Sequence, residues 1–214
     1  MAFQFAIPSG YAALGGRWDT ASQPAQVTLS NGNTTVSTDN TFPNDYSYTP
    51  NIRNLTALTG KHYFETKVTV NPNTTPYAIG FAQNSFINTD EIGFISPSAG
   101  YFFQTPGKLF INGSQTDSGI DPISGIYPVP GGPVIGWCID WPNRRFCLQT
   151  ATGVFSGSGS AAANPTTGTN CFSVSTLSAG TYYVFAGVFF RNFTVNNAFS
   201  GTNPNTTFPM FGLI

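Results

Sequence analysis

Alternating apolar and polar positions recur along the chain and predict β-strands joined by turns. The segment 60–70 alternates in this way, with Phe64 and Val68 on one face and Tyr63 and Glu65 on the other. No window of about ten residues shows the period of an amphipathic helix. The pattern therefore predicts an all-β fold, and the frequent turn residues favour antiparallel strands.

The stretch 134–148 predicts a β-hairpin around which the other strands are arranged. Two apolar runs flank a polar break at Pro142 and Asn143. Proline presets a turn φ, and asparagine tolerates the left-handed region. We expect Trp141 and Arg144 to close this turn. The resulting register pairs Asp140 with Arg145, Ile139 with Phe146 and Cys138 with Cys147.

Further strands are predicted on both sides of this hairpin. The segments 26–30 and 33–37 flank Asn31-Gly32, a dipeptide that favours a type I′ turn. The glycine inside the strand 77–82 predicts close packing or a bulge. Apolar segments at 93–103, 108–113, 182–190 and 193–199 complete the set. The stretches 38–54, 114–133 and 156–169 are interpreted as loops, the last one flexible.

Composition is consistent with one packed β domain outside the nucleic-acid-binding and membrane classes. Charged residues are 8% of the 214, against about 25% in an average soluble domain, whereas 40% are hydrophobic. The net charge of −1 without a basic patch argues against nucleic acid as a partner. No run of 18 apolar residues predicts membrane insertion, and the first ten residues lack the basic region of a usual signal peptide.

Catalytic chemistry finds little support in the sequence. His62 is the one histidine, and its place in a strand pattern predicts a structural role rather than that of a general base. The nine acidic residues show no spacing that indicates a glycosidase pair, and no phosphate-binding glycine loop is present. We therefore predict a protein that is not an enzyme and binds no cofactor. A pair formed by Asp140 and Arg145 would be structural.

The three cysteines leave two interpretations open. Cys138, Cys147 and Cys171 are either three buried or half-buried free thiols, or the first two form a cross-strand bridge in the expected register. A metal site needs about four close ligands, which three cysteines and one histidine at this spacing do not supply. No metal is therefore expected.

Five segments in this order resemble the SPRY (B30.2-like) domain. The matching pieces are Gly60-Lys-His-Tyr-Phe-Glu65, Tyr77-Ala-Ile-Gly-Phe-Ala82, Gly100-Tyr101 with Gly107–Gly113, Val134–Asp140 with Phe146–Leu148, and Tyr183–Val188 with Val195-Asn196. The segment from Trp18 to Asn33 resembles the one that precedes the domain in bacteriophage versions. Three turns depart from the family pattern, at Gly132-Pro133, at Asn143-Arg144 and after Asn196.

The resemblance implies an antiparallel β-sandwich of the SPRY (concanavalin-like jelly roll) kind at residues 18–200. Residues 1–17 are then an N-terminal arm, and 201–214 a C-terminal tail. Residues 1–16 are apolar without a period. They are either an arm that packs on a partner or a first strand that closes the sandwich.

The resemblance also implies that loops at one end of the sandwich bind peptides or protein surfaces. Carried over by position, the site would comprise Phe42, Pro43, Asn44, Asp45, Tyr46, Tyr101, Phe190 and Arg191. Aromatic side chains with an arginine are typical of binding hot spots. The alternative for Tyr101 and Phe190 is a place in the core.

The function expected from the phage-like resemblance is that of a bacteriophage structural protein located in the virion. It would decorate the capsid or form part of a tail fibre or other appendage, with host attachment through a surface protein or glycan as a further role. The apolar termini would contact other virion proteins in a homo-oligomer or symmetric assembly. The alternatives are a stand-alone SPRY adaptor that binds peptides or proteins, and a carbohydrate-binding module.

Overall fold

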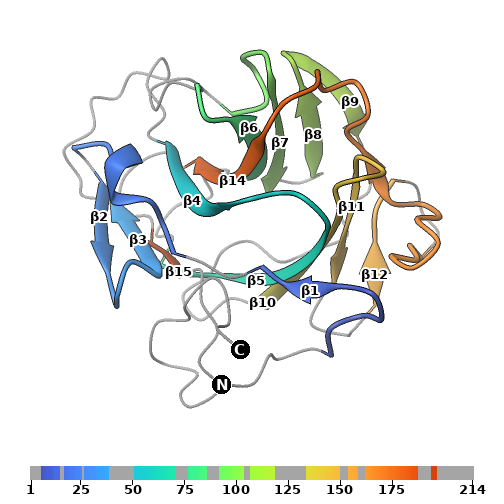
Figure 1. Ribbon diagram of the computed structural model, residues 1–214, viewed down its shortest axis with the longest axis horizontal. Helices are drawn as coiled ribbons and strands as arrows, with labels where there is room; N and C mark the ends of the chain where they lie inside the picture. Colours follow the sequence, from blue (N-terminus) through green and yellow to red (C-terminus); the bar gives the residue numbers. More distant parts are fainter. Residues whose placement is uncertain are drawn as a thin grey trace.

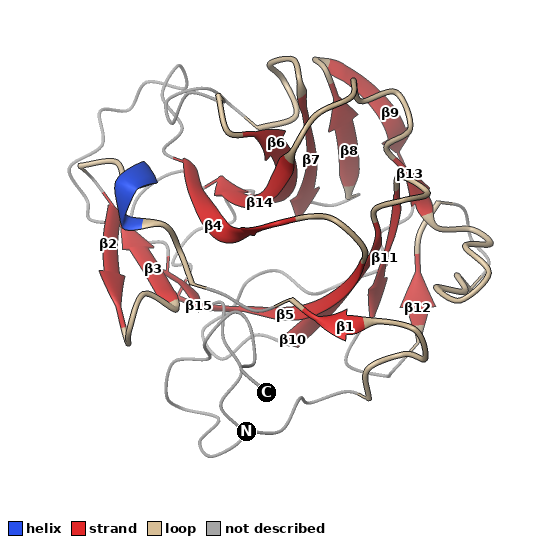
Figure 2. Cartoon of the chain, in the orientation of Figure 1, coloured by secondary structure: helices blue, strands red, loops and turns tan. Residues whose placement is uncertain are grey.

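Two β-sheets packed face to face make up the described part of the chain in the computed structural model (Figure 1). Strands dominate the described residues, which include one short 3-10 helix, Thr20–Ser22 (Figure 2). None of their helices is long and apolar enough to cross a membrane. The description covers residues 6–14, 17–25, 27–38, 51–70, 77–85, 92–103, 107–118, 134–149, 154–158, 162–187 and 194–196.

The larger sheet has nine strands and contains the predicted hairpin. Its main order is β12-β11-β10-β5-β15-β3-β2, with β1 beside β5 and β13 beside β11. The bounds are β1 Ala12–Ala13, β2 Val27–Ser30, β3 Thr35–Thr38, β5 Lys61–Val70, β10 Val134–Asp140, β11 Arg145–Gln149, β12 Phe155–Ser156, β13 Phe172–Ser173 and β15 Thr194–Asn196.

The smaller sheet has six strands in the order β4-β14-β6-β7-β8-β9. All of its neighbouring strands are antiparallel, and it lies across the core from β5, β10 and β11 (Figure 1). The bounds are β4 Asn51–Ala57, β6 Tyr77–Gln83, β7 Ser98–Phe103, β8 Lys108–Ile111, β9 Ser114–Ser118 and β14 Tyr182–Gly187.

Aromatic side chains from both sheets fill the core. Trp137 stacks on Phe64 with ring centroids 5.5 Å apart and on Phe146 at 5.8 Å. Phe81 of the smaller sheet meets Phe146 edge-on at 5.3 Å. The indole N–H of Trp137 donates to Thr66 Oγ1 at 2.9 Å, so this buried polar atom is satisfied. The two-residue period of the strands delivers these rings to one side of each sheet.

The predicted hairpin register is confirmed, with Asp140 opposite Arg145, Ile139 opposite Phe146 and Cys138 opposite Cys147. One detail differs. The left-handed residue is Arg144, at φ 49°, rather than Asn143. The Asn143 side chain instead donates to Asp140, and the Arg144 guanidinium lies 4.2 Å from the centre of the Trp141 ring. These contacts hold Arg144 in a conformation that asparagine adopts more readily.

Two strands were missed in segments interpreted as loops. β4 begins inside 38–54, and β9 lies inside 114–133. Both are end strands of the smaller sheet, and β9 begins with three exposed polar residues. An edge strand with exposed side chains lacks the apolar alternation on which the prediction depends.

The described part of the low-complexity stretch forms regular turns. Residues 162–170 form hydrogen-bonded turns centred on Asn164. The Asn164 Oδ1 atom accepts hydrogen bonds from the backbone N–H groups of Thr166 and Thr167, at 2.9 and 3.2 Å. Such asparagine turns supply backbone order that glycine and serine content alone does not indicate.

The described part of the N-terminal segment belongs to the sandwich. β1 runs parallel to the start of β5, and the Leu14 N–H donates to the Tyr63 carbonyl at 2.8 Å. The Leu14 side chain is fully buried in the core. Of the two alternatives for this segment, a first strand describes Ala12–Ala13, whereas contact of the arm with a partner stays a prediction.

The cysteines follow neither interpretation in full. A disulfide joins Cys147 to Cys171, with Cα atoms 4.9 Å apart, and Cys138 is a buried free thiol. The prediction of three thiols is therefore wrong for two of them, and no bridge links Cys138 to Cys147. The observed pairing depends on the return of the chain from 157 to 171 onto β11, which is a tertiary contact.

Candidate binding groove

A groove of about 240 Å³ opens where the edge of the smaller sheet approaches β13 and Ser158, which follows β12. β9 and β13 lie on the same side of the molecule (Figure 2). The groove has an apolar floor from β8 and a rim of hydroxyl side chains. Its lining residues are Leu109, Ile111, Thr116, Ser158, Ser173, Ser175 and Thr176.

The alternation around β13 places its hydroxyl groups on the rim. Phe172 and Val174 are buried in the core, whereas Ser173 and Ser175 are exposed and line the groove. The Ser173 hydroxyl donates to Ser175 Oγ at 3.0 Å and is thereby oriented. A short strand with a two-residue period therefore forms one wall of the groove.

The disulfide and a close backbone approach fix this wall. Cys171 directly precedes β13, and its bond to Cys147 ties the wall to β11. A Cβ atom on Gly157 would lie 2.0 Å from the Asn170 carbonyl oxygen, so only glycine allows the two segments to pass this closely. The disulfide and the close approach at Gly157 thus both fix the position of this wall.

The lining limits what the groove can do chemically. The seven lining residues that the structure describes are uncharged, and five of them carry hydroxyl groups that can donate and accept hydrogen bonds. No general acid, general base or charge-binding side chain is among them. This arrangement suits a neutral polar ligand with an apolar part.

A charged cluster surrounds Asp140, whose side chain is 1% exposed. Arg145 donates to Asp140 Oδ2 through Nη2 at 2.7 Å and through Nε at 3.0 Å, and Lys61 Nζ lies 3.6 Å from the same oxygen. Burial alone would raise the pKa of Asp140, but the Asn143 amide and the two cations outweigh it and hold the pKa below its usual range. The predicted structural role of the Asp140–Arg145 pair is confirmed.

The neighbouring His62 also has a structural role, as predicted. Its Nε2 atom accepts hydrogen bonds from the backbone N–H groups of Thr59 and Gly60, at 3.2 and 3.1 Å. An accepting Nε2 requires the neutral ring. Burial lowers the pKa of His62, which favours this form.

The structure places one of the predicted binding residues away from any surface. Tyr101 is 2% exposed, and its ring centre lies 5.1 Å from that of Phe172 in the core. Its expected place on a binding surface is therefore wrong, and the alternative, a core residue, describes it. The other predicted site residues lie outside the described part of the chain, so their grouping stays a prediction; they are Phe42, Pro43, Asn44, Asp45, Tyr46, Phe190 and Arg191.

The groove itself was not foreseen from the sequence. The alternation Phe172-Ser-Val-Ser175 could have indicated a short strand with hydroxyl groups on one face. Nothing local indicates that this strand approaches β9, more than 50 residues earlier in the chain. Among the described residues, no group of three or more His, Cys, Asp or Glu side chains is placed to hold a metal ion.

Two packed antiparallel sheets define the class of this protein as a β-sandwich. Comparison with solved structures then shows that this sandwich has the fold of SPRY domains. No protein-family model and no curated protein sequence matches the chain. The structural comparisons therefore carry the assignment of the fold.

Three solved structures illustrate the likeness. The TRIM65 PSpry domain matches with a TM-score of 0.60 and 15% identity, covering 87% of this chain and 92% of that domain. The SPRY domain of human HERC1 matches with a TM-score of 0.55 and 12% identity, over 83% of this chain and 94% of that domain. Stonustoxin matches with a TM-score of 0.55 and 14% identity, over 84% of this chain and 26% of the toxin.

These matches confirm the predicted fold class, an antiparallel SPRY-type β-sandwich. At such low identity the likeness is one of fold. The comparisons lend no support to the bacteriophage origin that the N-terminal segment suggested.

Proposed function

We propose that this chain is a non-catalytic binding module that holds a segment of another protein, as SPRY domains generally do. The observation that carries the proposal is the extent of the structural match, since the SPRY fold accounts for most of this chain and nearly all of the TRIM65 domain. Fold alone does not determine function, so the proposal also needs a site.

The groove supports an extended peptide as the ligand. A volume of about 240 Å³ lies below the range of about 300–1,000 Å³ usual for pockets that enclose small molecules. One or two side chains of a longer segment fit it better, with Leu109 and Ile111 as the apolar floor. The hydroxyl rim and the edge strand β9 offer hydrogen bonds to a peptide backbone.

Selection from a displayed random-peptide library on the immobilised full chain tests this proposal. We expect an enriched sequence whose binding, measured by calorimetry, weakens at least about tenfold when Ser175→Tyr fills the groove. Ser30→Tyr is the matched control, because Ser30 is an exposed strand serine away from the groove. Equal binding by both variants would place the site elsewhere, and no enriched peptide would contradict the protein-binding role.

A carbohydrate ligand is the second candidate, favoured by the neutral hydroxyl rim. A glycan array probed with the same protein separates the two. Binding to a glycan that Ser175→Tyr abolishes, without any selected peptide, would replace the first proposal with this one.

Location in a virion remains a separate proposal. The low charge of the chain and its apolar ends support it. Fractionation of purified particles from the source is the test, and absence of the protein from them would contradict it.

A further inference from the structure

Three cysteines meet on the face of the nine-stranded sheet that is turned away from the core. Cys138 and Cys147 are direct partners in the β10–β11 ladder. Their neighbours Ile139 and Phe146 belong to the core, so the alternation of side chains turns both cysteines to the other face. Cys171 reaches the same place through its disulfide with Cys147.

Cys147 therefore has two cysteines within bonding reach. Directly opposed residues of an antiparallel ladder have Cα atoms about 4.5–5.5 Å apart, inside the range of about 4.4–6.8 Å found for disulfides. The Cα atoms of Cys147 and Cys171 are 4.9 Å apart. By Cα separation, both pairings lie within the range found for disulfides.

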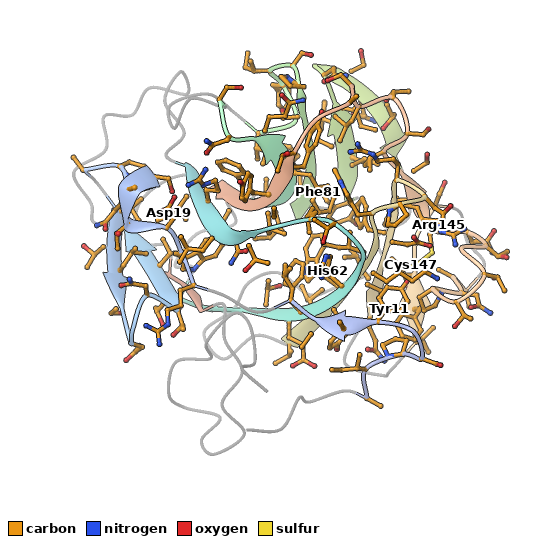
Figure 3. The ribbon with its side chains drawn as sticks, in the orientation of Figure 1. Tyr11, Asp19, His62, Phe81, Arg145 and Cys147 are labelled. Carbon is orange, nitrogen blue, oxygen red and sulfur yellow. A yellow bond between two sulfur atoms is a disulfide. The ribbon has the colours of Figure 1, made fainter. Side chains whose placement is uncertain are left out.

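The N-terminal strand β1 lies beside β5, and β10, which pairs with the other edge of β5, carries the free thiol. Cys138 is fully buried, and burial raises the pKa of its thiol. Burial raises the pKa of Tyr11, and the charges of Cys138 and Asp140 raise it further. The centre of the Tyr11 ring lies 5.6 Å from Lys61 Nζ. The Tyr11 hydroxyl donates to the Pro165 carbonyl at 2.8 Å. This hydrogen bond joins the N-terminal segment to the loop that precedes Cys171. Figure 3 labels Tyr11 and Cys147 on this side of the molecule.

We propose that Cys138 is an alternative partner of Cys147 in an internal thiol–disulfide exchange that releases Cys171. The Cys138 thiolate attacks Cys147 Sγ, the Cys138–Cys147 bond forms, and the Cys147–Cys171 bond breaks. The electron pair leaves on Cys171 Sγ, which takes up the proton lost by Cys138. One disulfide and one thiol exist before and after, so no external oxidant or reductant is consumed.

The exchange acts on the wall of the candidate groove. The present bridge ties the residue before β13 to β11, whereas the alternative bridge lies within the β10–β11 hairpin. After exchange, β13 keeps its ladder with β11 but loses its covalent anchor. The inference rests on the cysteine geometry alone and stands whether or not the groove binds a peptide.

Tryptic peptide mapping without reductant distinguishes the two bridges. Cleavage after Lys108, Arg144, Arg145 and Arg191 places Cys138 in one peptide and both Cys147 and Cys171 in another. The present bridge is then internal to one peptide, whereas the exchanged bridge links the two. The oxidised full chain is incubated at mildly alkaline pH, and samples taken over time are blocked with iodoacetamide and digested. Sampling continues until the fraction of linked peptides is constant.

We expect linked peptides from single chains, with alkylated Cys171, and none from Cys138→Ser. Tyr11→Phe removes the hydrogen bond to Pro165 and keeps the ring, so the linked peptides should appear about fivefold faster. The control Tyr183→Phe should leave the rate unchanged. In Cys171→Ser, oxidised glutathione should drive the Cys138–Cys147 bridge. Absence of linked peptides from wild type, Tyr11→Phe and Cys171→Ser alike would overturn the proposal, as would linkage found only between chains.

Discussion

At the scale of single residues, the half-buried His62 secures the turn before β5, and the buried Asp140 secures the turn that joins β10 to β11. His62 accepts two backbone N–H groups that precede β5, and Asp140 accepts from Asn143 and Arg145 across the hairpin turn. Buried polar groups contribute to stability only while these hydrogen bonds are made. Both residues therefore link the stability of the fold to pH.

His62 should make stability fall in mildly acidic solution. Burial lowers its pKa in the folded protein, so the unfolded chain, with a pKa near 6.5, binds a proton first as pH decreases. The contribution is complete above 6.5 and is lost as pH falls through the folded value. His62→Gln keeps an acceptor and removes the titration.

Urea unfolding between about pH 7 and about pH 5 measures this effect. We expect the slope of unfolding free energy against pH to be smaller in His62→Gln than in the wild type. Equal slopes would contradict the assignment of Nε2 as a neutral acceptor.

Asp140→Asn should destabilise the protein by about 2 kcal/mol at neutral pH, because Arg145 and Lys61 lose their charge-assisted partner. The pKa of Asp140 is depressed in the folded state, so its contribution is present above the unfolded value of 3.8 and is lost below it. Chemical denaturation should therefore show a difference between variant and wild type that narrows as pH falls below 3.8. A difference in unfolding free energy that does not change with pH would indicate that lost packing, not lost charge, causes the destabilisation.

At the scale of elements, close packing is found where Ile92 crosses the outer face of the smaller sheet. Gly80 and Gly100 are partners in the β6–β7 ladder, and Ile92 lies directly on them. The sequence predicted close packing or a bulge from the glycine in β6, and the packing is confirmed.

Gly80→Ala should cost about 1–3 kcal/mol, because its Cβ would lie 2.1 Å from the Ala99 carbonyl oxygen. Gly60→Ala is the matched control, since no atom lies within 4 Å of the Cβ it would add. Thermal and urea unfolding of the two variants should separate them. Similar stabilities of the two variants would mean that the backbone of the sheet shifts to accommodate the added methyl group.

The disulfide should contribute about 3 kcal/mol, the value expected for a bridge that spans a sequence separation of 24. Cys147→Ala removes the cysteine that the observed and the proposed bridge share, and its stability is compared with that of the wild type. Urea unfolding with and without reductant provides the measurement. Reductant should destabilise the wild type and leave the variant unchanged, and any other pattern would count against a stabilising bridge.

At the scale of the whole molecule, the two sheets share one aromatic core, and Leu14, directly after β1, is part of it. This limits how the predicted role of the termini in assembly can be tested. Removal of residues 1–16 would take away β1 and the buried Leu14, and any loss of assembly could then reflect unfolding.

Trimming should instead remove only 1–5 and 201–214. We expect light scattering to show an oligomer for the full chain and a monomer for the trimmed chain, if the apolar ends join subunits. Circular dichroism serves as the control for folding. A monomer in both forms would exclude assembly through the ends and leave a lone binding module.

The sequence by itself determined the all-β class, the register of the β10–β11 hairpin, the turn at Asn31 and the structural roles of His62 and Asp140. These features depend on side-chain alternation and turn chemistry, which act over a few neighbouring residues.

Only the tertiary structure decided the Cys147–Cys171 bond, the burial of Tyr101, the edge strands β4 and β9, and the groove. Each of these depends on segments that are distant in sequence and meet only when the sheets pack. Local patterns carry no information on which distant surfaces meet, because burial of apolar area is non-directional and is settled by the whole fold.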